Sequence, residues 1–239
     1  KDRRERRTQM NSFFQESLFA GVTISLLAYL AGTLLKKKFK LGFLNPLLIS
    51  IIITIIVLVV SGVDYDTYNA GAQYLSWFLT PATVCLAIPL YEQWELLKHH
   101  WRAVFLGILA GVFTSMGTVC VLAWLMGLSH EEYVTLLPKS ITTAIGMGLS
   151  EELGGYVTIT VAVIVVTGVL GNIMGEVICK IFRITDPIAK GLAFGASSHA
   201  IGTAKAMEIG EIEGAMSSLA IAVTGLLTVL FSSIFVGLL

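Results

Sequence analysis

Residues 51–60 read Ile-Ile-Ile-Thr-Ile-Ile-Val-Leu-Val-Val, and this run decides the fold class. A strand of a membrane barrel would alternate apolar and polar residues over about ten positions, and this run does not alternate. The run lies within 41–63, a stretch that contains no Asp, Glu, Lys or Arg. Because every backbone N–H and C=O group in lipid must be paired internally, an apolar segment of this kind forms a helix. The run therefore predicts a transmembrane helix.

Five further stretches of the chain also lack charged residues, namely 17–35, 67–91, 103–128, 153–175 and 214–239. Each is about as long as the roughly 18–20 apolar residues that cross a ~30 Å hydrocarbon core as a helix. Charged residues make up only 13% of the chain, against about 25% in soluble domains. We therefore expect an all-α polytopic membrane protein with six spans. The formal net charge of zero gives no reason to expect a nucleic-acid partner.

The loops alternate between basic and acidic composition. Four lysines lie in 36–40, and further basic residues lie in 92–102 and 180–190, whereas Asp64 and Asp66 form an acidic loop. The positive-inside rule places the basic loops in the cytoplasm. The same rule puts Met10, which resembles a natural start, on the outside of the membrane. We expect residues 1–9 to be a charged N-terminal tail or an added remnant, and 10–239 to be a single transmembrane domain.

Three segments are unsuited to a straight span. The stretches 140–150 and 191–204 are short and rich in Gly, Ser and Thr. Both are typical of re-entrant or broken helices, which occur at membrane depth only where they are buried in protein or line a cavity. The span 67–91 contains Pro81 and Pro89, and proline removes a backbone donor and clashes with the preceding turn. We expect this span to be kinked or discontinuous.

The breaks occur in corresponding places of two halves, about 41–128 and 153–239. Each half has a straight, a broken and a straight segment. The loop charges place the start of the first half in the cytoplasm and the start of the second half outside. Inverted repeats with broken helices that meet near the middle of the membrane are typical of secondary transporters. We therefore predict an inverted-repeat bundle, with 140–150 as a re-entrant segment.

The densest polar cluster is 197–205, which contains Ser197, Ser198, His199, Thr203 and Lys205. Ionisable side chains in an apolar chain are costly unless they face an aqueous path or one another. The positive end of a half-helix beginning here would favour a carboxylate. We predict a substrate-binding site for a small carboxylate anion. The alternative is that the hydroxyls bond back to their own helix and that His199 caps a neighbour.

Glu208 follows this cluster closely enough to pair with Lys205. We consider His199 and Glu208 as possible residues for proton or ion coupling, because histidine exchanges protons near neutral pH.

A second cluster follows Pro138, and its substrate-binding candidates are Lys139, Ser140, Thr142 and Thr143. A lysine at the mouth of a re-entrant segment would attract an anion, but it could equally extend to the lipid headgroups. Thr83, between the two prolines of the third span, completes the candidate set.

Enzymatic and cofactor chemistry have no sequence support. The three cysteines lack metal-ligand spacing, and no phosphate-binding loop, dinucleotide fingerprint or zinc signature is present. No nucleophile, base and orienting residue form a set. We expect no enzyme activity, no cofactor and no metal.

Four motifs carry a resemblance to a known family: Asn-Pro-Leu-Leu at 45–48, Pro-Ala-Thr-Val at 81–84, Leu-Pro-Lys-Ser-Ile-Thr-Thr at 137–143 and Ala-Ser-Ser-His-Ala-Ile-Gly-Thr-Ala at 196–204. In this order they resemble the LrgB/CidB family of bacterial membrane proteins, over essentially Met10 to Leu239. Ala144 and Tyr156 depart from the family pattern, where a proline and an isoleucine are expected.

The resemblance implies a multi-pass protein of the bacterial cytoplasmic membrane with an elevator-transporter-like fold. It also implies an antiholin-like role in controlling murein hydrolase activity, autolysis and programmed cell death, beside a holin-like LrgA/CidA partner. Relatives are implicated in moving pyruvate and glycolate. Two functions therefore stay open: a secondary transporter of small monocarboxylates, and a non-transporting regulator of lysis. Because a transporter with a large mobile unit commonly needs a scaffold interface, we expect a homodimer.

Overall fold

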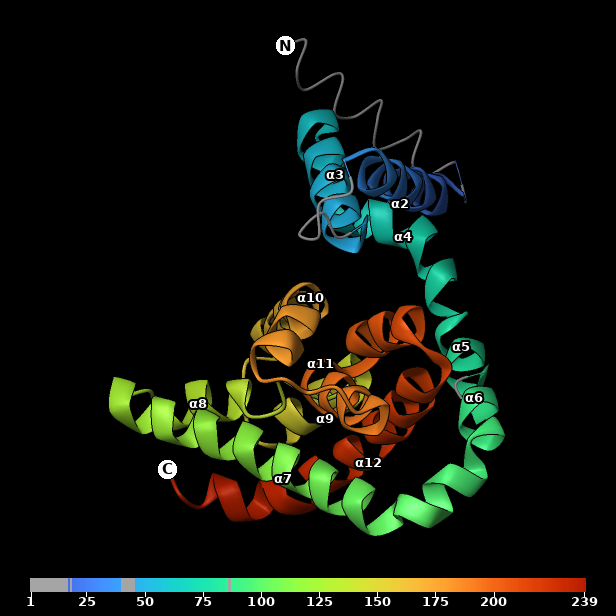
Figure 1. The fold of residues 1–239 in the computed structure, drawn as a ribbon. Helices are drawn as coiled ribbons and strands as arrows, with labels where there is room; N and C mark the ends of the chain where they lie inside the picture. Colours follow the sequence, from blue (N-terminus) through green and yellow to red (C-terminus); the bar gives the residue numbers. More distant parts are fainter. Residues whose placement is uncertain (1–16, 18, 40–45, 86) are drawn as a thin grey trace. The chain divides into compact units, whose positions relative to one another are not determined.

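The computed structural model describes residues 17, 19–39, 46–85 and 87–239, and the regular secondary structure of these residues is entirely helical. The chain divides into two compact units, Lys1–Cys85 and Leu86–Leu239 (Figure 1). The expected all-α architecture is confirmed. Residues 1–9 and Met10 lie outside the described residues, and the predicted inverted repeat, which relates parts of both units, stays a prediction.

The first unit is built around α2 (Ala20–Phe39), which packs against α3 (Pro46–Ser61) and α4 (Tyr65–Ser76). Gly21 allows the close approach to α4, because a Cβ at this position would lie 2.5 Å from the backbone nitrogen of Ala72. The hydroxyls of Ser25 and Tyr68 lie 2.6 Å apart and join the same two helices.

The predicted third span is discontinuous, as expected. It consists of α4, α5 (Leu79–Cys85) and α6 (Ala87–Glu92). Pro81 and Pro89 are each the third residue of a short helix. Proline is tolerated there because the first backbone N–H groups of a helix have no partner within it. Each proline therefore marks the start of a new helix within this span.

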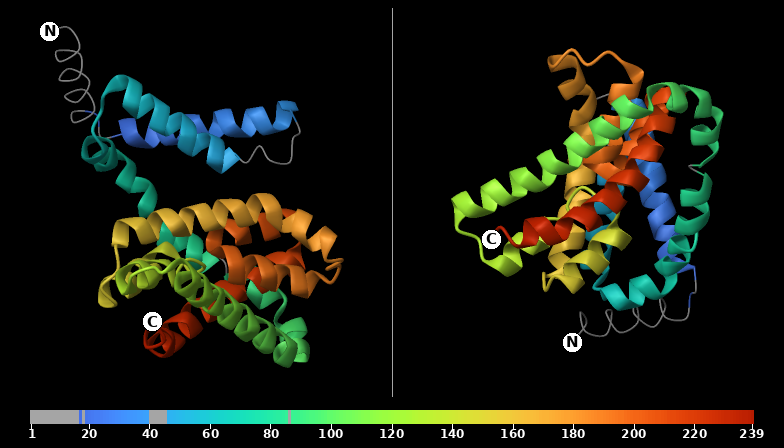
Figure 2. Two further views of the ribbon diagram at one scale, coloured as in Figure 1. Left: turned by 90° about the vertical axis from the view of Figure 1, so that its left-hand side faces the viewer. Right: turned by 90° about the horizontal axis from the view of Figure 1, so that it is seen from below.

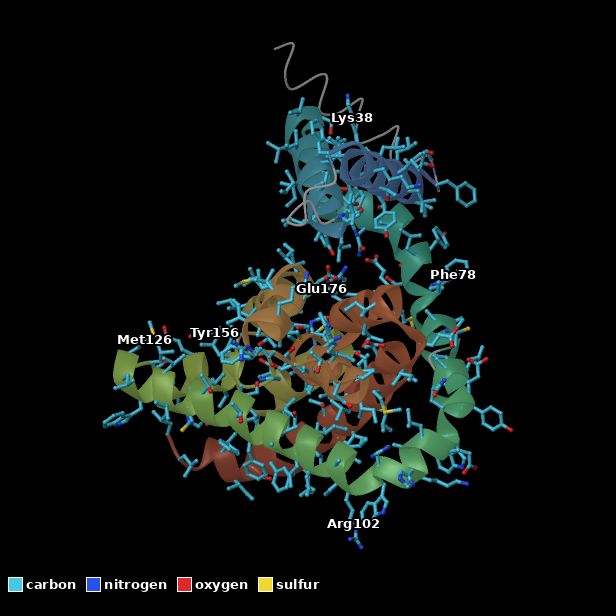
Figure 3. All side chains as sticks on the ribbon, viewed as in Figure 1. Lys38, Phe78, Arg102, Met126, Tyr156 and Glu176 are labelled. Atoms are coloured by element: carbon cyan, nitrogen blue, oxygen red, sulfur yellow. The ribbon has the colours of Figure 1, made fainter. Side chains whose placement is uncertain are left out.

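The second unit contains α7 (Trp94–Met126), α8 (His130–Leu136), α9 (Thr143–Glu152), α10 (Val157–Ile181), α11 (Pro187–Ile209) and α12 (Glu211–Val236). Helices α7 and α12 run side by side in the same direction (Figures 1 and 2). The main hydrophobic core includes residues of both, among them Ile108, Val112, Met116, Met216 and Ala220. Figure 3 shows Arg102 of α7 pointing away from this core.

Three of the described helices, α7, α10 and α12, are long and apolar enough to cross a membrane. This number is smaller than the six expected spans. Most of the stretch 17–35 belongs to α2, which has three lysines in its last turn, and 41–63 contributes the 16-residue helix α3. The remaining stretch, 67–91, is divided into short helices. The chain nevertheless has the helical, apolar character of a polytopic membrane protein.

The two short polar segments do not form straight spans. Helix α9 has ten residues, which corresponds to about 15 Å at the usual rise of an α-helix. Helix α11 is interrupted at Ser198 and His199, whose backbone angles are not helical. Both expectations of a short or broken helix are confirmed.

Helices α11 and α12 pack closely because α11 has glycines four residues apart, at 191 and 195. A Cβ on Gly195 would overlap the carbonyl oxygen of Ser217 and lie 2.7 Å from the Cβ of Ala220. A Cβ on Gly191 would lie 2.5 Å from the carbonyl oxygen of Glu213. Small residues at this spacing let the backbones of membrane helices approach each other.

Candidate functional site

The break in α11 is a sharp local departure from helical geometry. Ser198 has φ −134° and ψ 16°, and His199 has φ 43° and ψ −139°. A positive φ is unfavourable for a residue with a Cβ, and such conformations cost about 1–3 kcal/mol. Both side chains are buried. Surrounding contacts must therefore hold the break in place.

Helix α10 supplies these contacts. A Cβ on Gly171 would overlap the Ser198 hydroxyl, and a Cβ on Gly168 would lie 2.7 Å from His199 Nε2. The two glycines therefore leave room for both side chains at the break. His199 Nε2 lies 2.9 Å from the carbonyl oxygen of Ile164. Because a carbonyl only accepts, Nε2 is the donor.

Asn172 of α10 also supports the break, since its Nδ2 donates to the carbonyl oxygen of Ile201 over 2.9 Å. Broken helices are stable at membrane depth when neighbouring groups pair the backbone in this way.

The hydroxyls of the cluster are occupied by local partners. Ser197 Oγ donates to the carbonyl oxygen of Ala193 over 2.6 Å and lies 2.9 Å from Ser198 Oγ. Thr203 Oγ1 donates to the carbonyl oxygen of His199 over 3.1 Å and lies 2.7 Å from Ser217 Oγ. The alternative of hydroxyls bonding back to their own helix therefore applies to Ser197 and Thr203, although hydroxyl groups can exchange such partners for a ligand.

A cavity of about 970 Å³ lies among α7, α10, α11 and the turn before α9. Three of the predicted site residues line it, namely Lys139, Ser140 and Ser197. The remaining candidates in this unit are not part of its wall: Ser198, His199, Thr203, Lys205, Glu208, Thr142 and Thr143. His100 and Asp186 also line the cavity.

The register between α7 and α11 locates the polar wall of this cavity. Cβ atoms on Gly107 and Gly111 would lie 3.3 Å from the side chains of Leu192 and Ala196, respectively. The two helices therefore run in the same direction, and one further turn brings Ser115 of α7 level with the break in α11. Ser115 is also near the middle of the uncharged stretch 103–128. The polar wall thus lies deep within the apolar part of the unit.

Lys139 is connected to Ser115 by a short chain of hydrogen bonds. Its Nζ donates to Ser140 Oγ over 3.0 Å, and Ser140 Oγ lies 2.9 Å from Ser115 Oγ. Within the described part of the chain, no carboxylate forms an ion pair with Lys139. A half-buried ammonium group on a cavity wall, with no ion-pair partner among the described residues, favours an anionic ligand.

Lys205 has the opposite environment. Its Nζ lies 2.6 Å from Glu176 Oε1 and 3.3 Å from Glu208 Oε2. Glu176, labelled in Figure 3, comes from α10, so this ion pair joins α10 to the second half of α11. The expected pairing of Lys205 with Glu208 is confirmed. The charge of Lys205 is thus balanced by the protein.

Thr142 and Thr143 lie at the start of α9 and do not line the cavity. Thr142 is the N-cap residue of α9 and Thr143 is its first residue, and no side-chain capping bond forms at Thr142. Thr83 belongs to α5 in the first unit, and its side chain lies outside the described residues.

Several residues of the site were not singled out from the sequence. Thr114, Ser115 and Thr118 of α7 line the cavity, and Gly168 and Gly171 support the break. Thr114, Ser115 and Thr118 lie in an otherwise apolar helix, where a hydroxyl usually bonds back to the preceding turn. Only the register with α11 reveals their role.

Comparison with known proteins identifies the family. The LrgB-like family profile matches residues 25–238. The Antiholin-like protein LrgB of Bacillus subtilis (strain 168) is 40% identical over 223 residues, which cover 93% of this chain and 96% of the relative. The proteins of the same name from Bacillus mycoides (strain KBAB4) and Bacillus cereus (strain B4264) are each 39% identical over 218 residues, covering 91% of this chain and 95% of the relative. No solved structure matches. The chain therefore belongs to the LrgB-like family.

Proposed function

We propose that this protein is an antiholin-like membrane regulator that restrains cell lysis together with a holin-like partner of the LrgA/CidA type. The supporting observation is the similarity to proteins named antiholin-like, which extends over nine tenths of this chain and of each of these relatives. The chain also has the apolar helices that a regulator acting within the membrane requires.

This function is tested by lysis. Expression of the chain in a bacterium that lacks its own LrgB-like protein is expected to slow detergent-induced autolysis, measured as the loss of culture turbidity. The control is the same strain with an empty vector. Equal lysis rates with the protein present in the membrane would rule out the antiholin-like role.

A second candidate is the movement of small monocarboxylates through the cavity, and Lys139 is the observation that favours it. The lysine lies on the cavity wall beside two serine hydroxyls and has no ion-pair partner among the described residues. One ammonium group balances one carboxylate, whereas a second negative charge would stay uncompensated in a poorly polarisable site. The geometry therefore favours a monoanion over a dicarboxylate.

Transport is tested in liposomes that contain the purified protein. Uptake of labelled pyruvate, lactate or glycolate is expected to exceed that of protein-free liposomes, and labelled succinate is expected to enter poorly. Lysis control combined with no uptake would support the regulator alone. Uptake of succinate as fast as pyruvate would contradict the single-charge argument.

A further inference from the structure

A second, smaller cavity of about 330 Å³ lies where α10 is connected to α11. Three cationic residues line it: Lys180, Arg183 and Lys190. Thr185 adds a hydroxyl to the same wall. We name this cavity the α10–α11 pocket. Such a set of cations with a hydroxyl suits an anion that carries several acceptor oxygens.

The pocket is placed at the end of a membrane-spanning helix. Helix α10 ends at Ile181 and is among the helices long and apolar enough to cross a bilayer. The end of such a helix lies near the polar headgroups. Basic pockets between helices at this depth are suited to phosphate-bearing headgroups.

Arg183 occupies an unusual backbone position in the wall of the pocket. Its φ is 54°, and the bonds from Ile184 N to Cys179 O (2.8 Å) and from Arg183 N to Lys180 O (3.2 Å) form a Schellman motif. Glycine is the residue best suited to this position. The cation is therefore not needed for the turn, and glycine at this position would preserve the backbone.

The negative charges nearby are already engaged. Glu176 lines the pocket, but Lys205 Nζ lies 2.6 Å from its carboxylate. Asp186 accepts the N–H of Ala189 at the start of α11 over 2.8 Å. The three cations of the wall thus exceed the one carboxylate that lines the pocket.

The pocket also has an apolar side, which favours a ligand that carries an apolar part. Phe194 is 2% exposed and Cys179 is 6% exposed, and Ile209 packs against the cluster that they form with Ala206. All three line the pocket. A ligand with a phosphate group and an adjoining apolar part would contact both surfaces.

We propose that the α10–α11 pocket binds a phosphate-bearing anion, either a phospholipid headgroup or a soluble phosphate compound. Arg183 and Lys190 hold the phosphate oxygens, and Phe194 packs beneath them. Lys139 does not line this pocket, although Cys179, Ile184 and Phe194 line both cavities, and the proposal does not depend on transport.

The experiment uses the full chain purified in a zwitterionic detergent and measures its thermal midpoint. One arm adds phosphatidylglycerol, with phosphatidylcholine as its control, and the other adds pyrophosphate, with sodium chloride at matched ionic strength. Phosphatidylglycerol, pyrophosphate or both are expected to raise the midpoint, whereas phosphatidylcholine, whose phosphate charge is balanced by its choline, is not. The arm that responds identifies the source of the phosphate group.

Arg183→Gly and Lys190→Gln are each expected to weaken the response, raising the half-effective probe concentration about tenfold, because each removes a charge-assisted contact. The matched control is Lys98→Gln, since Lys98 pairs with Glu95 on the exposed side of α7. Arg183→Gly should keep its own thermal midpoint because glycine suits the turn. No response to either probe, or an undiminished response in the Arg183→Gly and Lys190→Gln proteins, would overturn the proposal.

Discussion

Lys139→Met is expected to remove most uptake of small monocarboxylates by liposomes that contain the protein. Lys139 lies on the cavity wall and donates to Ser140 Oγ, which in turn lies beside Ser115 Oγ. It has no ion-pair partner among the described residues. A hydrogen bond to a charged group contributes about 1.5–3 kcal/mol, which corresponds to a loss of about tenfold to a hundredfold in uptake at low substrate concentration. Methionine retains much of the length of the side chain and removes the charge together with its N–H donors.

Two matched variants make this result interpretable. Lys98→Met removes an equal charge from the exposed side of α7, where Lys98 Nζ lies 2.7 Å from Glu95 Oε1, and it should leave uptake intact. Lys139→Arg keeps the charge and should retain part of the uptake. If the Lys139→Met protein is folded and transports as fast as the natural chain, the anion does not bind at this wall. The same variant in the lysis assay shows whether lysis control depends on transport.

Gly195→Ala is expected to lower the stability of the protein, although alanine is the better helix former. A Cβ at this position would overlap the carbonyl oxygen of Ser217, and a backbone atom cannot rotate away as a side chain can. Overpacking of a close contact costs about 1–3 kcal/mol, which exceeds the gain of about 1 kcal/mol from helix propensity. At about 2–4 °C per kcal/mol for a chain of this size, the thermal midpoint should fall by several degrees.

Gly117→Ala is the control for this substitution. Gly117 lies within α7, and no heavy atom lies within 4 Å of the place that its Cβ would take. The thermal midpoint of this variant should therefore rise or stay the same. Equal midpoints for the Gly195→Ala and Gly117→Ala proteins would mean that α11 and α12 do not depend on their close approach.

The main breaks of the fold are predictable from the sequence because their causes are local. Pro81 and Pro89 cannot continue a helix, and the residues around His199 are rich in Gly, Ser and Ala. Both segments are broken in the structure. Lys139 could be identified for a similar reason, since a lone lysine within an apolar chain is conspicuous whatever its contacts.

The parts of the site that the sequence does not reveal depend on contacts between distant segments. Ser115 gains its role from a hydrogen bond to Ser140, 25 residues away. In the sequence, Lys205 and Lys139 are both single lysines within apolar segments. In the structure, Glu176 of α10 forms an ion pair with Lys205 and not with Lys139. Neither the packing of Gly171 against Ser198 nor this ion pair follows from spacing, because both require the register of α10 against α11.

The support of the α11 break by α10 has a mechanical consequence. Ser198 and His199 rest on glycines of α10, and His199 and Ile201 are tied to it by hydrogen bonds. These contacts fix the position of the break along α10, so a displacement of α10 along its axis would carry the break with it. Such a displacement would change the position of the break relative to Ser115 of α7, which is level with it in this structure.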